Sequence, residues 1–578
     1  MDAIDSDLSE LSDLPNSDDE GEDWASVNLS QPHDTDEDSL SEVEDDEPLL
    51  PPPPKNRKRR LVWKNAIFSK VINNADPAPP PLGPEEPIDY FKEYFDSEFY
   101  ELAAEMTNLY SVQKTGSSLG TTASEIRRFI GIHIAMSAFK FPRYRMYWGS
   151  RTRIPLIADA MNFNRFSRLR NLFHLVDILS KDPENTDRVW KVRPVIDRVL
   201  KKTESIVPSE YVSVDEQMVP YTGALDIKQY IRGKPTPWGI KIFMLCNSNG
   251  IILTFDVYQG KKTILTEEQK QFGLGPGMVL ALAGRVQLRP HTKIFFDNFF
   301  TSIPLLEELE RKSMYGTGTI RANRVLGAKL ESDTSLKKKG RGAFHELVSG
   351  EVCLIKWMDC RSVIVASNMI GSGNVKNVMK WCKKTKTEVQ VTQPEAIAAY
   401  NLSMGGVDKL DQMVSYYRTL IRSKKWTLRL VFHLIDLAVV NSWLEYVEIC
   451  KAQNMRQKNI VDSFTFRLDI AETLIMSEDT PRRRGRPRSL PSSEEEESDE
   501  EDSVAENRRK RKLKFRRPCS AVKKDSFAHW PEKFAAQNRC KNAPCIMKTR
   551  FMCTKCNVPL CLEESRNCFA QFHKPKET

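Results

Sequence analysis

Two aspartates interrupt stretches of the chain that otherwise read as buried β-strands. Asp215 lies within YVSVDEQMV and Asp297 lies within TKIFFDNFF, where most neighbours are β-branched, aromatic or otherwise apolar. An ionised carboxylate is costly to bury in such a stretch unless it is paired with a cation or bound to a metal ion. The fold is therefore expected to bring these carboxylates to a polar site.

A third acidic segment, YNLSMGGVDKLDQM at 400–413, contributes Asp408 and Asp411. These two residues are three positions apart just after a Gly-Gly pair, so a helix that begins there directs both from one face of its first turns. A single Asp at the end of an element is more often a cap or turn residue than a ligand. The set of Asp215, Asp297 and Asp408 nevertheless suggests a carboxylate cage for Mg²⁺, a hard cation that prefers oxygen ligands.

The residues around these acids resemble the three acid motifs of the piggyBac transposases, a branch of the DDE transposases with a ribonuclease H-like core. The matching stretches are VDEQMVPYTG, FDNFFTSIPL and GGVDKLDQM, in this order. Further similar stretches are YIRGKPTPWGIK (230–241), GTIRANR (318–324) and the Trp of SKKWTLRL, Trp426. The resemblance runs continuously from about residue 88 to about residue 480.

The resemblance implies a multidomain chain. It would have an α/β ribonuclease H-like catalytic core with an insertion domain, an α-helical dimerisation and DNA-binding domain built from two chain segments, and a small zinc-bound C-terminal module. The expected folded parts are the helical domain at 88–210 and 418–478, the catalytic core at 211–322 and 396–417, and the insertion domain at 323–395. Composition adds a disordered acidic and Pro-rich tail at 1–87 and a disordered basic and acidic linker at 479–518. The last segment, 519–578, is expected to be a cysteine-rich zinc-binding domain.

Periodicity within the predicted core favours a mixed α/β architecture. The apolar runs GIKIFMLCNS and IILTFDVYQG flank Asn249 and Gly250, the pair that a two-residue type I′ hairpin turn requires. MVLALAGRV and SIPLLEELERKS are expected to be helices, the second starting near Ser302, and YGTGTI is expected to close the sheet. Strands, a hairpin and helices in this order predict a layered α/β fold.

Charge is distributed very unevenly along the chain. The formal net charge is +8, although the first 54 residues hold 19 acidic residues and no Lys or Arg. The remaining chain therefore has a large basic surplus, which suits a polyanionic partner such as double-stranded DNA. Two basic runs, KNRKRR at 55–60 and NRRKRKLKFRR at 507–517, are candidate nuclear localisation signals and favour a nuclear protein.

A basic stretch in the predicted linker, PRRRGRPRSLP, contains Arg-Gly-Arg-Pro at 484–487. An extended Arg-Gly-Arg fits the narrow minor groove of A·T-rich DNA, because Gly permits close approach and the arginines meet a strong negative potential. Arg484 and Arg486 are therefore candidate DNA contacts of an AT-hook. The alternative is an ordinary basic linker, since a four-residue match occurs often by chance.

No membrane partner is expected. The most apolar stretch, LVFHLIDLAVVNSWL, carries His433 and Asp436, and no uninterrupted apolar run approaches the length that crosses a bilayer. The first residues are acidic where a signal peptide would be basic, which predicts a soluble intracellular protein.

Cysteines cluster at the C-terminal end, where seven of the twelve lie after residue 518. This clustering favours metal binding over a disulfide framework. The pair Cys553 and Cys556 forms a tight C-x-x-C knuckle, and the region has enough ligands for two tetrahedral structural Zn²⁺ sites. The expected ligands are His529, Cys540, Cys545, Cys553, Cys556, Cys561, Cys568 and His573. Cys519 is the alternative to His529, and the resemblance implies a cross-brace module that binds transposon-end DNA.

The resemblance also implies the chemistry. The expected reaction is cut-and-paste transposition, which consists of nicking at each element end, hairpin formation and insertion at TTAA. Each step is an in-line displacement at phosphorus. Two Mg²⁺ ions per active site would assist these displacements, and Mn²⁺ could substitute for Mg²⁺. Asp215 would bridge both ions, Asp297 and Asp408 would each hold mainly one, and Asp411 would orient a water.

The partners expected from the resemblance are double-stranded DNA (the transposon terminal repeats and the TTAA target) and a second copy of the chain in a homodimer. Lys424, Lys425 and Trp426 are the expected DNA contacts of the helical domain. The competing hypothesis is a domesticated protein that binds a specific DNA sequence or a chromatin partner and lacks catalysis. Intact acids favour the enzyme, whereas the hook-like linker and acidic tails suit either function.

Overall fold

The computed structural model describes residues 61–75, 83–476, 523 and 529–574, apart from positions 233, 235, 261, 262, 264, 384 and 544. Several predicted features lie outside these residues: the acidic tail before residue 61, most of the Pro-rich spacer, the linker with Arg484 and Arg486, both basic runs, and Cys519.

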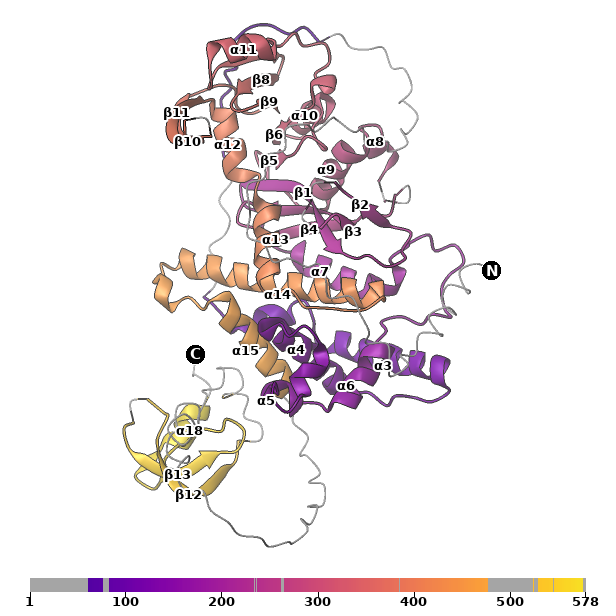
Figure 1. Ribbon diagram of the computed structural model, residues 1–578, viewed down its shortest axis with the longest axis vertical. Helices are drawn as coiled ribbons and strands as arrows, with labels where there is room; N and C mark the ends of the chain where they lie inside the picture. The colour runs from indigo at the N-terminus through magenta and orange to yellow at the C-terminus, as the bar shows by residue number, and fades with distance from the viewer. Residues whose placement is uncertain are drawn as a thin grey trace.

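A nine-stranded mixed sheet forms the centre of the protein (Figure 1). Its strand order is β2-β3-β1-β5-β6-β9-β8-β7, and β4 pairs with β3 beside this path. β5 is parallel to both β1 and β6, whereas the other neighbouring strands are antiparallel. The strands are β1 (Tyr211–Pro220), β2 (Lys228–Tyr230), β3 (Trp238–Asn247), β4 (Ile252–Val257), β5 (Lys293–Phe296), β6 (Tyr315–Thr319), β7 (Phe344–Ser349), β8 (Val352–Met358) and β9 (Ser362–Ser367).

Helices cover both faces of the central part of this sheet, as expected for an α/β core. Alternate residues of β3 point to opposite faces. Phe243 belongs to the apolar cluster formed with α9 (Leu274–Arg285) and α10 (Ile303–Arg311), whereas Met244 belongs to the cluster formed with the helical part of the chain. Ser302 caps α10 by accepting a hydrogen bond from the backbone N–H of Leu305.

The hairpin expected around Asn249 and Gly250 is present, but the connection from Asn247 to Ile252 is longer than the predicted two-residue turn. Gly250 has a φ of +98°, which favours glycine. A Cβ at Gly250 would also lie 3.2 Å from the backbone nitrogen of Leu410. The turn is therefore packed closely against helix α13 (Gly406–Tyr416), which carries Asp408 and Asp411.

The stretch YGTGTI does not close the sheet as the sequence predicted. It forms β6, whose second neighbour is β9, with Thr317 opposite Ser367 and Thr319 opposite Val365. An unpaired β6 would leave a row of backbone donors and acceptors open, and the segment predicted as an insertion domain covers it. β7, β8 and β9 thus extend the core sheet, while β10 (Lys376–Cys382) and β11 (Thr387–Gln393) form a separate hairpin.

Residues 61–75 pack on the sheet, although the composition of 1–87 predicted disorder throughout. The backbone of Lys64 exchanges two hydrogen bonds with Val348 on the edge strand β7, each with an N···O distance of 2.9 Å. Phe68 is buried, and its N–H donates to a side-chain oxygen of Glu346. The prediction was wrong here because average composition conceals a short apolar segment that covers an open sheet edge.

The helical part of the protein is built from two chain segments that share one apolar cluster. Helix α15 (Ser463–Met476) packs on α4 (Ala123–Phe139), and the long α14 (Trp426–Ala452) contacts α2 (Pro87–Lys92) and α7 (Arg193–Thr203) (Figure 1). The remaining helices of the first segment are α3 (Ser97–Thr115), α5 (Pro155–Ala158) and α6 (Phe163–Leu172).

A buried ion pair fixes the junction between the helical part and helix α13. Asp436 and Arg467 are 2.8 Å apart, and both side chains are almost completely buried. The carboxylate also accepts hydrogen bonds from the backbone N–H and the hydroxyl of Thr419, which lies shortly after α13. Because a buried charge is stable only when it is paired, these bonds hold the chain that leaves α13.

Among the described residues, α14 is the helix that is long and apolar enough to cross a bilayer by length and composition. Its most apolar window is 83% buried inside the protein, as is typical of the core helix of a globular domain.

The C-terminal module is small and has little apolar core. β12 (Pro531–Arg539) pairs with β13 (Lys548–Cys553), and two short strands, β14 (Leu562–Glu563) and β15 (Arg566–Asn567), precede helix α18 (Cys568–His573). Five cysteines provide most of its buried cluster, and a sixth, Cys545, packs against it. A segment this short needs additional stabilisation, such as a bound structural metal ion, to stay folded.

Candidate catalytic centre and zinc sites

The register of two parallel strands brings Asp215 and Asp297 together. Val214 of β1 lies opposite Phe296 of β5, and each aspartate is the next residue along its strand. β5 ends at Phe296, so Asp297 lies at the carboxyl end of that strand, whereas β1 continues to Pro220 and Asp215 lies in its middle. In open α/β sheets, ligands bind in the crevice outside the carboxyl ends of the strands.

Glu216 joins this pair, although the sequence analysis did not single it out. One carboxylate oxygen from each of Asp215, Glu216 and Asp297 lies within 4.8 Å of the others. The backbone N–H of Glu216 donates to a carboxylate oxygen of Asp215 at 2.8 Å, which helps to orient that side chain. These oxygen ligands suit a hard divalent cation.

Asp408 and Asp411 approach from helix α13. Gly406 allows this approach, because a Cβ there would lie 2.4 Å from the Ser213 hydroxyl on β1 and 2.6 Å from the Asn247 carbonyl on β3. The side chain of Asp408 is exposed on the first turn and lies outside the close group of three acids. Its role as a metal ligand stays a prediction.

Asp411 is held by a chain of buried polar side chains. The amide nitrogen of Gln217 donates to the Asp411 carboxylate, and the amide oxygen of Gln217 lies 2.7 Å from His433 Nε2. Burial lowers the pKa of His433 to about 3, so the ring is neutral, and its Nε2–H must be the donor to Gln217. The helical part of the chain thereby positions an acid of the candidate catalytic centre.

The loop that follows Asp297 is fixed by Arg324, from the GTIRANR stretch. The Arg324 guanidinium donates to the backbone carbonyls of Asn298, Phe299 and Thr301 at 3.0, 3.0 and 3.2 Å. Because these bonds all converge on the turn after Asp297, Arg324 is a positioning residue for that carboxylate.

We expect Arg324→Ala to reduce DNA cleavage by about 100-fold, since a misplacement of about 1 Å can cost that much. The circular dichroism spectrum should not change, because Arg324 is only partly buried. Arg321→Ala is the matched control: Arg321 makes one bond to the side chain of Asn298 and should have a much smaller effect. Equal cleavage by the two variants would show that the carbonyl clamp has no positioning role.

The electrostatics of the acid group fit the binding of a divalent cation. Burial and then the charge of Glu216 raise the pKa of Asp215 to about 8, and the same two causes raise the pKa of Asp297. Burial also raises the pKa of Asp411. Carboxylates placed so close together favour their neutral forms unless a cation compensates them, so the donor set and its charge suit Mg²⁺ or Mn²⁺.

We expect stabilisation by Mg²⁺ to increase with pH. The pKa of Asp215 is about 8 in the fold and 3.8 as an ordinary side chain. The metal-free fold therefore binds the extra proton, and its stability falls as pH rises from about 4 through 8. A bound cation relieves this loss, so the Mg²⁺-induced rise in Tm should be larger at pH 8.5 than at pH 6.5. Differential scanning fluorimetry should show this trend, and Asp215→Asn should remove most of it; a pH-independent shift in wild type would contradict it.

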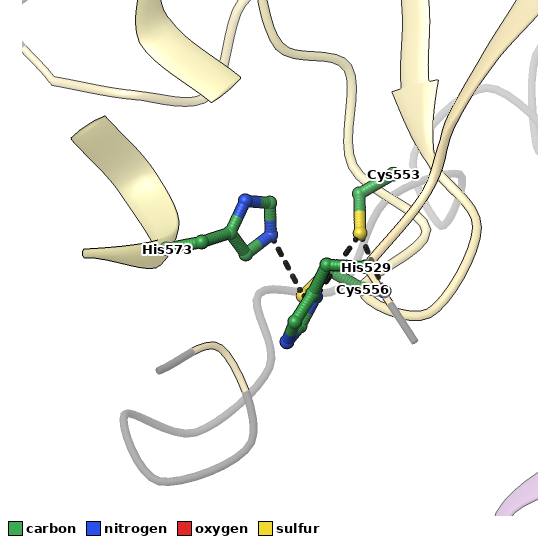
Figure 2. A group of neighbouring side chains, drawn as sticks. All are labelled: His529, Cys553, Cys556 and His573. Carbon is green, nitrogen blue, oxygen red and sulfur yellow. Dashed lines mark hydrogen bonds between the residues drawn. The ribbon is translucent and has the colours of Figure 1, made fainter. Parts of the chain in front are cut away.

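One group of candidate zinc ligands consists of His529, Cys553, Cys556 and His573 (Figure 2). His529 Nδ1 lies 3.3 Å from Cys553 Sγ and 3.4 Å from Cys556 Sγ, and His573 Nε2 lies 3.5 Å from Cys556 Sγ. Tetrahedral zinc with ordinary Zn–S and Zn–N bonds places sulfur and nitrogen about 3.5 Å apart. This group therefore has the dimensions of a zinc site.

A hydrogen bond to the backbone determines which ring nitrogen of His573 is available to a metal ion. Its Nδ1 lies 2.7 Å from the backbone carbonyl oxygen of Phe569, which can only accept. The proton is therefore on Nδ1, and Nε2 is free to bind metal. Cys519, the alternative to His529, lies outside the described residues. His529, a predicted ligand, lies in the group with Cys553, Cys556 and His573.

The second group consists of Cys540, Cys545, Cys561 and Cys568. Cys545 Sγ and Cys561 Sγ are 3.9 Å apart, close to the roughly 3.8 Å between two sulfurs of a tetrahedral zinc site. The two groups alternate along the chain: the first is completed by residues before and after the second. Zinc would therefore cross-link the whole module.

Comparison with known proteins agrees with this geometry. A family model described as Transposase IS4 matches residues 86–443. PiggyBac transposable element-derived protein 3 from Homo sapiens is 32% identical over 496 residues, which cover 84% of this chain and 76% of the relative. The chain belongs to the piggyBac transposase family. PiggyBac transposable element-derived protein 2 from Homo sapiens is also 32% identical, over 69% of this chain and 67% of its own length.

A solved structure of a piggyBac transposase, a synaptic complex with hairpin DNA, has the same fold. It matches with a TM-score of 0.57 at 22% identity and covers 84% of this chain and 99% of the other. The piggyBac-type fold predicted from the sequence is therefore confirmed at this level.

The DNA contacts predicted for this piggyBac-family chain lie at the start of α14. Lys424 is exposed. The ammonium group of Lys425 donates to the backbone carbonyl of Asn171 at 2.6 Å, and Trp426 is partly buried against the helical cluster. Lys424 is thus the most accessible of the three, and DNA binding by all of them stays a prediction.

Three functional candidates of this piggyBac-family site were missed or left without a role by sequence reasoning. Glu216 and Gln217 directly follow Asp215, so three consecutive polar residues stand in an otherwise apolar strand. This run of polar residues could have indicated that Glu216 and Gln217 belong to the site, because a buried polar side chain is costly unless it binds a partner. Arg324 ends the GTIRANR stretch, but only the folded loop reveals its three carbonyl partners.

Proposed function

We propose that this chain is a metal-dependent DNA transposase that performs cut-and-paste transposition. The observation that carries the proposal is the convergence of Asp215 and Glu216, from β1, with Asp297, directly after β5, while Asp408 and Asp411 lie on the adjacent α13. Acid groups of this kind bind divalent cations, which supply charge to the attacking and leaving oxygens of a phosphodiester displacement.

We assign a separate role in this reaction to each acid and to Arg324. Asp215, Asp297 and Asp408 would hold two Mg²⁺ ions, with Asp215 shared between them and Mn²⁺ as a substitute. Asp411, held by Gln217, would orient the attacking water for end nicking. Arg324 would keep Asp297 in place while the DNA is exchanged. We also propose that the core is ribonuclease H-like. The strand order β4-β3-β1-β5-β6 within the sheet supports this assignment.

The proposed DNA partners are the transposon terminal repeats and a TTAA target, in the nucleus. Each element has two ends and each chain one acid centre, so a homodimer is the smallest assembly that handles both ends. The cysteine-rich module, with two structural zinc ions, would recognise the terminal repeats, and Lys424, Lys425 and Trp426 would add contacts from the helical part. The basic surplus of the chain supports a DNA partner of this kind.

A second candidate function is a domesticated DNA-binding or chromatin-binding protein without catalysis. Two relatives in Homo sapiens are named as derived from a transposable element, and the exposed Asp408 lies outside the closest acid group. These observations favour this candidate specifically.

A plasmid excision assay with the element's own flanking ends separates the two functions. The transposase should excise the marker and join the ends at TTAA only when Mg²⁺ or Mn²⁺ is present. Gel shifts on the same ends should be unaffected by removal of the metal. Specific binding to the ends with no excision in either metal would support the domesticated protein instead.

A further inference from the structure

Glu216 is the least satisfied of the buried acids near the catalytic centre. Its side chain is 10% exposed, and its Oε2 atom is buried and has no hydrogen-bond partner among the residues that the structure describes. Its Oε1 faces the ammonium group of Lys234 at 3.3 Å. A charge-assisted bond between nitrogen and a carboxylate is normally about 2.7–2.9 Å long, so this pairing is loose.

Two other buried acids of the same protein, Glu346 and Asp436, accept bonds at both carboxylate oxygens. Glu346 accepts hydrogen bonds from the backbone N–H of Phe68 and from the N–H and hydroxyl of Ser372. Asp436 accepts bonds from Thr419 and Arg467. These two acids have structural roles. The Oε2 atom of Glu216, by contrast, lies beside two other acids without a hydrogen-bond donor among the described residues, which indicates a ligand-binding group.

Lys234 supplies the compensating charge. It lies on the loop between β2 and β3, and its side chain is 32% exposed. Its charge acts on Asp215 and Asp408 as well as on Glu216. A lysine ammonium is a single, mobile, strongly hydrated charge, so a divalent cation can replace it among the same carboxylates.

We propose that Glu216 is an additional ligand of the divalent-cation site and that Lys234 is its counter-ion in the metal-free protein, which the cation displaces. This inference rests on the proposed metal-dependent function. It assigns Glu216 to the metal site and makes Lys234 a competitor of the metal. The freed ammonium then remains at the rim of the site, where it can meet a DNA phosphate.

Isothermal titration of the zinc-loaded full chain with Mn²⁺, without DNA, tests the proposal. Glu216→Gln keeps the size of the side chain and should weaken Mn²⁺ binding about tenfold. Lys234→Gln should strengthen it, also about tenfold, because the metal no longer competes with a bound ammonium. In the double variant, the gain from Lys234→Gln should be much smaller, since Glu216 is the main partner of that lysine.

Two matched controls accompany these variants. Lys228→Gln changes a lysine of the neighbouring strand β2, which is bonded to the carbonyl of Gly223 rather than to the acids, and should bind Mn²⁺ like wild type. Lys234→Arg keeps the positive charge and should not show the gain of Lys234→Gln. If Lys234→Gln does not fold, the Glu216→Gln titration still decides the role of Glu216.

The sign of the change separates this proposal from a structural role for the ion pair. If Lys234 only holds the acids in place, Lys234→Gln will bind Mn²⁺ more weakly or equally, and the proposal is overturned. Unchanged binding by Glu216→Gln overturns it as well but leaves the proposed transposase intact. Failure of wild type to bind Mn²⁺ at a site that Asp215→Asn removes would instead reject the proposed function.

Discussion

Excision is expected to fall by about a thousandfold or more in the variants Asp215→Asn, Asp297→Asn and Asp408→Asn. A bound cation contributes several kcal/mol to a phosphodiester displacement, and each 1.4 kcal/mol is worth a factor of ten. Asn has the size of Asp but lacks the charge that holds the cation. The measurement is excision in the plasmid assay, with gel shifts on the same DNA to show that binding to the ends is retained.

Asp226→Asn is the matched control for these variants, because Asp226 is an exposed acid that follows β1 and lies outside the close acid group. It should excise at the wild-type rate. Asp411→Asn should be severe but leave some activity, since Asp411 would orient water rather than hold the cation. Near wild-type excision by Asp215→Asn or Asp297→Asn would refute the metal-dependent mechanism.

The second large effect concerns zinc. Metal analysis of the full chain is expected to give two zinc ions per chain, and a strong chelator should unfold the C-terminal module. The reason is that binding of structural zinc is worth about 10–16 kcal/mol in zinc-finger peptides and is inseparable from folding in such small domains. Limited proteolysis should therefore cleave the module after chelation and spare the sheet and helices.

Single substitutions distinguish the two zinc groups. Cys556→Ser and Cys561→Ser each remove a ligand from a different group and should each lower the zinc content. Cys360→Ser removes an exposed free cysteine of the insertion segment and should retain both ions. Retention of two zinc ions by Cys556→Ser or Cys561→Ser would mean that the four-ligand groups are not the binding sites.

The parts of the fold that the sequence predicted well are those with strong local signals. The strands that carry Asp215 and Asp297 are apolar runs that β-propensity and burial both favour. Helix α10 begins at a serine cap followed by Pro304, two local start signals that agree. The eight candidate zinc ligands were predicted from residue type and spacing, and the structure brings them into two groups of four that could each hold a metal ion.

The parts that could not be predicted depend on contacts between distant segments. Nothing near β6 indicates that β9 pairs with it, since strand pairing is decided by which edges the fold leaves open. Residues 61–75 pack on the sheet through partners that are distant in sequence, such as Val348 for Lys64 and Glu346 for Phe68. The orphaned oxygen of Glu216 likewise becomes visible only when the positions of all neighbouring donors are known.

The central claim is that Asp215 and Glu216 of β1, together with Asp297 directly after β5, form a divalent-metal site in the folded protein. Anomalous diffraction from crystals of the full chain grown with Mn²⁺ tests it most directly, and the zinc sites provide an internal control. The account predicts two manganese peaks about 3.5–4 Å apart beside Asp215 and Asp297, in addition to two zinc peaks in the C-terminal module. Zinc peaks in the module with no manganese peak between Asp215 and Asp297 would contradict it.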